Sequence, residues 1–295
     1  MTNTFKIASY NIWFDRTIYL ERTKSLCKYI DTINIDCICL QEVRPEIYKL
    51  LIMSLKTFPY HFPNEINVSY DCAIFSKYPI SQSTNIKYPK SSMNRSLNVI
   101  KIDYPYNIRV INNMKTEQLI TKNIEIVIAT SHFESLFDKT FLNKEKIKQY
   151  EIANNALEIA YQTCKNVILC ADTNIMVHEE KYFDELFEKS LWVDAWKIKG
   201  NDENKFTYDY LYNTYVNSNG GKFRSRLDRI IFKTNNCNLT QFDIILTPDI
   251  KKKRKKTNDE YPFIQTNSST SFGQTHKEVE PSDHFGIYAT FTVSI

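Results

Sequence analysis

Glycine is scarce in this chain, with five residues among 295. So little glycine leaves little room for flexible linkers between domains. Hydrophobic residues make up 42% of the chain and aromatic residues 14%, which is enough to bury a large core. We therefore expect a single domain that spans residues 1–295.

A strong excess of one charge is also missing, because 38 Lys and Arg residues face 34 Asp and Glu residues. The formal net charge of +4 argues against a protein that coats nucleic acid in bulk. A mild positive balance suits an enzyme that acts on a polyanion.

Cysteine pairs with CxxC spacing are absent as well. The seven cysteines lie mostly inside apolar runs, and they are Cys27, Cys37, Cys39, Cys72, Cys164, Cys170 and Cys237. This usage is typical of small core residues in a reducing compartment, so we expect an intracellular protein. The sequence begins with a strand-like run at residues 5–10 and contains neither a signal-peptide pattern nor a long apolar run, so we expect no membrane partner.

Hydrophobic periodicity predicts strands with helices between them. Leu26, Ile30 and Ile33 recur at helical spacing, and the expected helices lie near residues 26–33, 47–55, 143–164 and 179–189. A buried strand ends at residues 40–42, and further strands are expected at residues 5–10, 72–77, 97–104, 124–130, 167–170, 227–232, 239–246 and 286–293. This order favours an α+β protein in which two sheets pack face to face with helices outside.

Residues 249–280 break the pattern. A basic run, Lys251 to Lys256, precedes a segment rich in Ser, Thr and Asn that lacks apolar periodicity. We expect a long, basic and flexible surface loop. The basic run has two interpretations. It is either a patch for nuclear import or DNA contact, or a solvated loop that keeps the protein soluble. A nuclear location follows from the first interpretation.

Polar residues that could take part in catalysis or ligand binding occur at the ends of the expected strands. Taken singly, Asn11 could cap a turn, Glu42 could be a helix N-terminal charge, and Asp172 could form an Asx turn. Their shared position changes the interpretation, because the strands of one sandwich can bring their ends to a single rim. The residues in this position are Asn11, Glu42, His132, Asp172, Asn174, Asp283 and His284.

These side chains match what hydrolysis of a phosphodiester requires: charge neutralisation, an oriented water and help for the leaving oxygen. The carboxylate of Glu42, joined by Asp283 directly or through water, suits Mg²⁺ or Mn²⁺. Asp172 is suited to align and deprotonate the attacking water. The amides of Asn11 and Asn174 can bind the phosphate without adding negative charge.

His284 needs a partner that fixes its tautomer, and Asp228 can provide it. A charged or proton-sharing His284 beside the phosphate would stabilise the transition state. The alternatives are a strand-end histidine that contacts solvent and an aspartate that is only a surface charge.

Four ordered motifs resemble those of the endonuclease/exonuclease/phosphatase superfamily. They are Ser9-Tyr10-Asn11, Leu40-Gln41-Glu42, Ala171-Asp172-Thr173-Asn174 and Pro281-Ser282-Asp283-His284-Phe285-Gly286. The resemblance implies a four-layer α/β/β/α sandwich of the DNase I-like type, with two mixed sheets flanked by helices.

Within that superfamily, residues 130–135 (Thr-Ser-His-Phe-Glu-Ser) resemble the branch that removes tyrosine-linked protein remnants of the topoisomerase type from DNA 5′ ends. Residues 92–97, 206–209 and 226–230 extend the similarity. The resemblance implies a monomer that acts on a single-stranded DNA 5′ end carrying tyrosine or peptide, with protein-linked RNA as a further substrate. It assigns phosphate or DNA contacts to His132, Ser135, Arg95, Lys146, Tyr208 and Arg226.

Three positions depart from this pattern: Tyr10 replaces a Trp, Ala171 replaces a Gly, and Met176 replaces an Arg. They affect substrate binding more than chemistry. Other superfamily activities remain as alternatives, namely an abasic-site endonuclease, a deadenylase, or an inositol or sphingolipid phosphodiesterase. An inactive homologue that binds nucleic acid or protein would require the loss of a metal or base position, and Glu42, Asp172 and His284 are all present.

Overall fold

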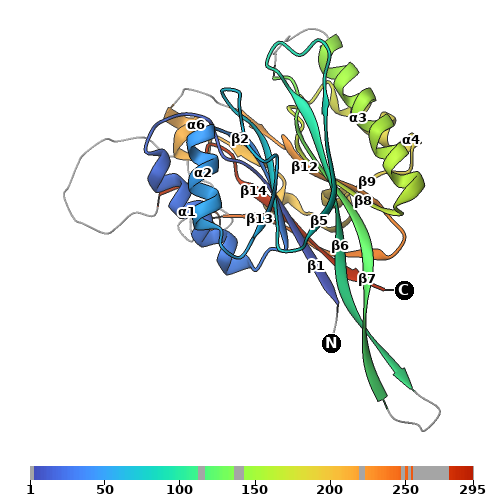
Figure 1. Cartoon of the computed structure of the whole chain (residues 1–295). Coiled ribbons are helices and arrows are strands. Elements are labelled where there is room, and N and C mark those ends of the chain that lie inside the picture. The colour runs from blue at the N-terminus through green and yellow to red at the C-terminus, as the bar shows by residue number, and fades with distance from the viewer. Residues whose placement is uncertain are drawn as a thin grey trace.

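Two six-stranded mixed sheets lie face to face at the centre of the molecule (Figure 1). The computed structural model describes residues 3–111, 117–135, 143–218, 223–246, 250–251, 254 and 279–294. The first sheet has the order β13-β14-β1-β2-β4-β3 and consists of β1 (Thr4–Asn11), β2 (Cys37–Val43), β3 (Tyr60–Phe62), β4 (Asp71–Ser76), β13 (Cys237–Ile245) and β14 (Gly286–Val293). The second sheet has the order β5-β6-β7-β8-β12-β9 and consists of β5 (Ile80–Lys87), β6 (Ser96–Ile111), β7 (Glu117–His132), β8 (Asn166–Asp172), β9 (Val193–Asp194) and β12 (Asp228–Thr234).

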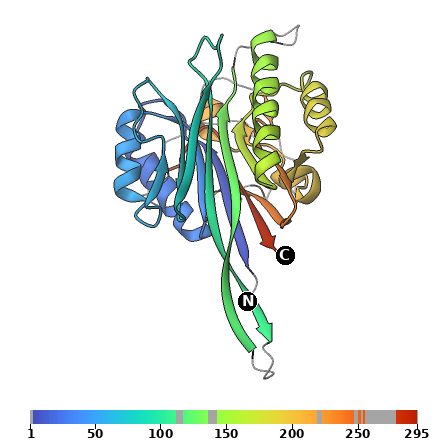
Figure 2. The same ribbon diagram turned by 45° about the vertical axis from the view of Figure 1, so that its right-hand side comes forward.

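Helices cover the outer face of each sheet. Figures 1 and 2 show α1 (Tyr19–Ile33) and α2 (Pro45–Ser54) on the first sheet, and α3 (Lys144–Thr163) and α4 (Glu180–Lys189) on the second. Short connections complete the described chain: α5 (Ala195–Lys199), η1 (Asp202–Asn204), α6 (Thr214–Ser218) and a small ribbon of β10 (Tyr208–Asp209) with β11 (Arg224–Ser225). The expected α/β/β/α sandwich is confirmed.

The helices begin where local chemistry favours it. Asn143 precedes α3, and its side chain accepts hydrogen bonds from the backbone N–H groups of Glu145 and Lys146, which have no partner within the helix. Pro45 occupies the first turn of α2, where a missing N–H costs nothing. In α1 the apolar positions Leu26 and Ile30 are buried, as their spacing predicts.

Three apolar cores separate the four layers. The central core lies between the sheets and includes Phe5, Ile128, Ile230 and Phe291. A second core joins α1 and α2 to the first sheet, and a third joins α3 and α4 to the second sheet. The two sheets are therefore held in fixed positions, and so are the strand ends at their rim.

Each sheet contains one central pair of parallel strands. In the first sheet β1 runs parallel to β2 and Asn11 lies beside Gln41; in the second β7 runs parallel to β8 and His132 lies beside Asp172. Parallel neighbours end at the same edge of a sheet. Antiparallel β12 begins at this edge, since Asp228 lies opposite Asp172, and β14 begins there beside the end of β1. Both sheets therefore bring polar residues to one rim.

The longest departure from the expected strands is the hairpin of β6 and β7, each of 16 residues. β5 pairs with β6 only as far as Ile102, and β8 pairs with β7 from Val127, so the rest of the hairpin projects as a two-stranded arm (Figure 1). The strands expected at residues 97–104 and 124–130 are shorter than β6 and β7, although apolar residues continue to alternate past Pro105 at Tyr106 and Ile108. Pairing within the hairpin maintains the longer strands.

Most of the expected basic loop at 249–280 lies outside the described residues. Of those that are described, Ile250 is buried, and the guanidinium of Arg254 lies 3.4 Å from the carboxylate of Asp209, so these two residues pack against the body of the protein.

Among the described residues, no helix combines the length and the apolar character needed to cross a membrane.

We expect Phe291→Ala to lower the free energy of unfolding by about 3–5 kcal/mol, because it removes a fully buried ring from the central core. This ring packs edge-on against Phe232 of the second sheet, with 5.2 Å between centroids, so its loss leaves a cavity between the sheets. Urea denaturation measures the effect. Leu119→Ala is the control, because Leu119 is 53% exposed on the arm and should change stability by less than about 0.5 kcal/mol. Equal effects of the two variants would contradict this view of the core.

Candidate active site

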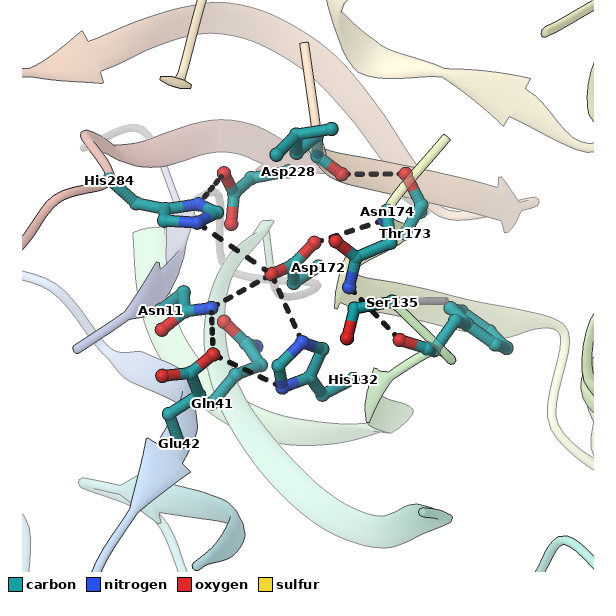
Figure 3. A network of polar contacts seen from close by, with 12 residues as sticks. Asn11, Gln41, Glu42, His132, Ser135, Asp172, Thr173, Asn174, Asp228 and His284 are labelled. Carbon is teal, nitrogen blue, oxygen red and sulfur yellow. Dashed lines mark hydrogen bonds and ion pairs between the residues drawn. The ribbon is translucent and has the colours of Figure 1, made fainter. Parts of the chain in front are cut away.

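Asp172 lies at the centre of the rim (Figure 3). Its carboxylate Oδ2 accepts a hydrogen bond of 2.8 Å from Asn11 Nδ2, and its Oδ1 accepts one of 3.0 Å from the backbone N–H of Asn174. Burial favours the neutral acid, but His132, His284 and these hydrogen bonds favour the anion more strongly and hold the pKa of Asp172 below its ordinary value. Asp172 is therefore an ionised acceptor that can orient a water molecule.

Glu42 lies on the far side of Asn11 from Asp172. Its Oε1 accepts a hydrogen bond of 3.1 Å from Asn11 Nδ2, and its Oε2 accepts one of 2.8 Å from the backbone N–H of Phe14. The register of β2 shifts between Leu40 and Val43, and Glu42 adopts a left-handed φ of 61°. Such a backbone conformation is costly for glutamate, and it is maintained here where the carboxylate faces the site.

The charge around Glu42 fits a divalent cation. Burial and the nearby carboxylate of Asp283 raise the pKa of Glu42 to about 7. Two neighbouring carboxylates that disfavour each other's charge form an oxygen-rich set of the kind that Mg²⁺ or Mn²⁺ binds. A second group of ligand atoms, from Asp172, Asp228 and His284, lies within 4.8 Å of one another, so the described rim contains an acidic and histidine cluster that could hold a metal.

His284 and Asp228 form the expected pair. His284 Nδ1 lies 2.8 Å from Asp228 Oδ2, and the opposite ring nitrogen, Nε2, lies 3.9 Å from Asp172 Oδ2. Burial opposes a charge on His284, but Asp228, Asp172 and Asp283 outweigh it and raise the pKa of His284 well above its ordinary value. His284 is therefore a cation whose Nε2 faces the centre of the site.

His132 is the neutral counterpart. Burial and the guanidinium of Arg95 lower the pKa of His132 well below its ordinary value. Nδ1 of His132 accepts a hydrogen bond from Arg95 Nη1, which leaves the proton on Nε2, 3.4 Å from Asp172 Oδ2. Arg95 thus contributes to the site by orienting His132.

The segment that carries Arg95 is fastened to the end of β7. Glu134 is fully buried and accepts hydrogen bonds from the hydroxyls of Ser91 and Ser92 and from the amide of Gln149. Ser135 lies beside the same segment, with its hydroxyl 3.3 Å from the sulfur of Met93. These contacts explain structurally why a glutamate and a serine follow His132.

Asn174 and Tyr208 also lie at the rim. Asn174 has a left-handed φ of 47°, a conformation that asparagine tolerates, and its Nδ2 donates to the carbonyl of Phe133. The ring of Tyr208 meets His284 edge-on with 5.2 Å between centroids, and stacks on Phe223 at 4.8 Å. The structure therefore brings together all seven expected catalytic residues, with His132, Ser135, Arg95 and Tyr208 around them.

Lys146 and Arg226, which were expected to contact DNA, are instead buried and paired with carboxylates in the structure. Lys146 is 1% exposed, and its ammonium group donates to the carbonyl of Asn174 and to the carboxylate of Glu179. Arg226 is also buried, where it forms an ion pair with Asp194. Lys146 supports the backbone behind Asn174, and Arg226 fastens the beginning of β12; neither presents its charge to a ligand.

Sequence reasoning missed Arg22, which joins two segments of the site. Its buried guanidinium donates to the carbonyl of Pro281, just before Asp283, and to four carbonyls of residues 12–17, just after Asn11. Helical spacing could have indicated that Arg22 is buried, because it precedes Leu26 and Ile30 on the apolar side of α1. A charge in that row requires buried partners.

Gln41, which lies in the Leu40-Gln41-Glu42 motif, connects the sheets directly below the rim. Its Nε2 donates to the hydroxyls of Ser9 and Thr130, at 3.2 Å and 2.9 Å. Thr130 belongs to the second sheet, so this amide fixes the two parallel strand pairs relative to each other.

We expect Arg22→Lys to lower the free energy of unfolding by about 2–4 kcal/mol, because an ammonium group cannot reproduce a guanidinium that donates to five carbonyls. Urea denaturation checks this, with Lys24→Arg on the exposed side of the same helix as control. If both variants matched the unchanged protein, the guanidinium would not be the link between the two segments.

Comparisons with known proteins extend this picture. The profile of the Endonuclease/Exonuclease/phosphatase family matches residues 8–284. Tyrosyl-DNA phosphodiesterase 2 of Bos taurus is 26% identical over 235 residues, covering 78% of this chain and 58% of that protein. The Homo sapiens protein of the same name is 25% identical over 236 residues, covering 78% and 58%. The chain thus spans less than two thirds of the length of these relatives.

Solved structures show the same fold. D. rerio TDP2 in complex with a single-strand DNA product has a TM-score of 0.72 at 19% identity, covering 98% of this chain and 99% of that one. An endonuclease/exonuclease/phosphatase family protein from Bacteroides thetaiotaomicron has a TM-score of 0.69 at 12% identity, covering 100% of both chains. Because the family profile extends over nearly the whole sequence, from the β1 motif to His284, this chain belongs to the endonuclease/exonuclease/phosphatase family.

Proposed function

We propose that this chain is a metal-dependent phosphodiesterase that hydrolyses 5′-phosphotyrosyl bonds between DNA ends and protein in DNA repair, and leaves a 5′-phosphate. One observation carries the proposal: a buried, ionised Asp172 is surrounded by the side-chain amide of Asn11, the backbone N–H of Asn174 and two histidines of opposite protonation state. Further support comes from the relatives, which are named tyrosyl-DNA phosphodiesterase 2. The motif at residues 130–135 favours this activity over the other superfamily activities.

Asp172 orients the attacking water by accepting a hydrogen bond from it. The water oxygen forms a bond to phosphorus while the bond from phosphorus to the tyrosine oxygen breaks, in line with the attack. The water proton passes to Asp172 and then to solvent, and tyrosine leaves as a phenolate. Since the unperturbed pKa of a phenol is about 10, this leaving group needs little help from a general acid.

The charge that develops on the phosphate oxygens is met by donors already in place. His284 offers a charged N–H from Nε2, and His132 offers a neutral one from its own Nε2. Neither ring has to change its protonation state during the reaction, and neither adds negative charge to the site. Preorganised donors of this kind lower the barrier because they need no reorientation when charge develops.

Glu42 and Asp283 are proposed to bind the cation, as Mg²⁺ or Mn²⁺. A bound cation would neutralise charge on the phosphate and on the leaving oxygen. Glu42 is prepared for this role because its carboxylate is oriented by Asn11 and by the backbone N–H of Phe14. Asp283 is oriented by the hydroxyl of Ser282, 3.2 Å away.

The proposed substrate is a single-stranded DNA 5′ end that carries tyrosine or a peptide, and protein-linked RNA is a further candidate. The stacked rings of Tyr208 and Phe223 beside His284 suit a base next to the phosphate. A related structure contains a single-strand DNA product, which supports DNA as the ligand. We propose that the protein acts as a monomer, within a reducing compartment and in the nucleus; its seven free, buried cysteines are compatible with that setting.

The decisive assay uses an oligonucleotide with a 5′-phosphotyrosyl end, beside 3′-phosphotyrosyl and abasic-site oligonucleotides. We expect cleavage of the first alone, dependent on added Mg²⁺ or Mn²⁺, and a loss on the order of a hundred-fold in turnover for Asp172→Asn. Cleavage of the abasic-site strand instead would replace this function with an endonuclease activity. A near-normal rate for Asp172→Asn would mean that another group orients the water.

We expect Glu42→Gln to fold normally but to require more than about ten-fold higher Mg²⁺ for half-maximal activity, because the ligand keeps its shape and loses its charge. Titration of Mg²⁺ in the same assay measures this. Glu65→Gln, which changes an exposed glutamate, is the matched control and should leave the titration unchanged. An unaltered Mg²⁺ requirement in Glu42→Gln would remove Glu42 from the metal site.

A further inference from the structure

Thr207 is a buried threonine that contacts two other segments of the site. Its hydroxyl oxygen accepts hydrogen bonds of 3.1 Å from the backbone N–H groups of both Leu227 and Asp228. Its backbone carbonyl accepts one of 2.7 Å from the N–H of Phe285. Only 1% of Thr207 is exposed, so water does not compete for these bonds. Thr207 therefore holds Asp228 directly, and it also holds the residue that follows His284.

Asp228 and His284 come from different sheets, so their pairing depends on how the two strand starts are fixed. Asp228 begins β12 of the second sheet, and His284 precedes β14 of the first. Their side chains meet at 2.8 Å, between His284 Nδ1 and Asp228 Oδ2 (Figure 3). Thr207 binds one strand start through its hydroxyl and the other through its carbonyl. It thus connects the two sheets at the place where the pair forms.

The bonds to Leu227 and Asp228 use the hydroxyl oxygen of Thr207 as an acceptor, which serine also provides and valine lacks. A valine at this position would leave two buried N–H groups without that partner, and such groups are costly where water is excluded. The start of β12 would shift toward other partners, and Asp228 would shift with it. The hydroxyl therefore controls where Asp228 meets the ring of His284.

We propose that Thr207 is a positioning residue: its hydroxyl fixes Asp228, and Asp228 in turn fixes the direction in which His284 presents Nε2 to the phosphate. This proposal rests on the proposed function, in which His284 stabilises the charge that develops on the phosphate oxygens. Thr207 acts through its neighbours, since it is buried below the rim. Its effect therefore falls on the chemical step. Loss of the adjacent ring of Tyr208 would instead weaken the binding of the DNA end.

The first test compares Thr207→Val with Thr207→Ser in steady-state cleavage of the 5′-phosphotyrosyl oligonucleotide. Val removes the hydroxyl and keeps the branched shape, whereas Ser keeps the hydroxyl and loses a methyl group. We expect Val to lower kcat about ten-fold or more with KM within about two-fold, and Ser to retain kcat within about three-fold. A normal kcat in Val, an equal loss in Ser, or a raised KM with a normal kcat would overturn the proposal.

A double-mutant cycle with Asp228→Asn tests whether Thr207 acts through Asp228. If it does, Thr207→Val should cost less than about two-fold in kcat once Asp228 is already Asn, because both changes disturb the same pair. Losses that multiply independently would contradict this route. Thr290→Val is the matched control, because Thr290 is a buried threonine whose hydroxyl has no hydrogen-bond partner within the described part of the chain. Its kcat should equal that of the unchanged protein.

A measurement without substrate examines the pair itself. The proton on His284 Nδ1 has an NMR resonance whose position depends on its hydrogen bond to Asp228, and the resonance is identified by its displacement in Asp228→Asn. We expect Thr207→Val to shift this resonance, and Thr207→Ser and Thr290→Val to leave it in place. An unmoved resonance in Thr207→Val would overturn the proposal even if kcat falls. If urea denaturation shows that Val is poorly folded, Thr207→Ala takes its place with the same expected outcomes.

Failure of the proposed function is recognised separately, as absence of 5′-tyrosyl cleavage by the unchanged protein. The resonance of His284 would still decide whether Thr207 positions the pair, because that measurement requires no substrate.

Discussion

The hydrogen bond between Asn11 and Asp172 joins the two sheets at the rim, and the geometry of the site depends on it. Asn11 ends β1 of the first sheet and Asp172 ends β8 of the second, so the bond crosses the interface between them. The same amide also binds Glu42, which links the proposed metal ligand to the proposed base. An amide can make this bridge because it donates two protons without carrying a charge. A carboxylate at position 11 would repel both neighbours, and a lysine would add a charge that has to be desolvated.

Electrostatic balance is the second constraint on this rim. Four carboxylates converge here, and three of them, Glu42, Asp172 and Asp228, are buried, while Asp283 is partly exposed. The protein compensates with a charged His284 and with Arg22 behind the loop, while His132 stays neutral. Burial and the neighbouring carboxylate of Asp283 still raise the pKa of Glu42. A divalent cation is the simplest addition that would let Glu42 and Asp283 be ionised together.

How much of this could be predicted from the sequence depends on the kind of signal. The strand ends were predictable, because alternating or continuous apolar runs stop at Asn11, Glu42 and Asp172, and a sandwich brings such ends together. The roles of Lys146 and Arg226 were not, because similarity in sequence gives a position along the chain but not the partners of a side chain. Their acidic partners, Glu179 and Asp194, lie more than thirty residues away, and burying a cation beside an anion costs less than leaving either unpaired.

Other features were beyond sequence reasoning for a different reason. The outer half of β7 and the edge strand β5 carry mostly polar, exposed residues, so no hydrophobic pattern marks them, and they exist through pairing with a neighbour. The rings of Phe14 and Tyr70 stack with 4.8 Å between centroids, but the two residues come from separate loops, so no local sequence pattern predicts this contact.

The rim has a rigid buried level and a partly exposed surface level. Below the surface, buried charges are fixed by the backbone: Arg22 holds the segments next to Asn11 and Asp283, and Lys146 holds the carbonyl of Asn174. These contacts cost desolvation, but they position the reactive groups within narrow limits, which catalysis requires. At the surface, Phe14 and Tyr208 are stacked on neighbours and remain partly open. We expect substitutions of these two rings to leave the arrangement of Asp172, Asn11 and the two histidines unchanged.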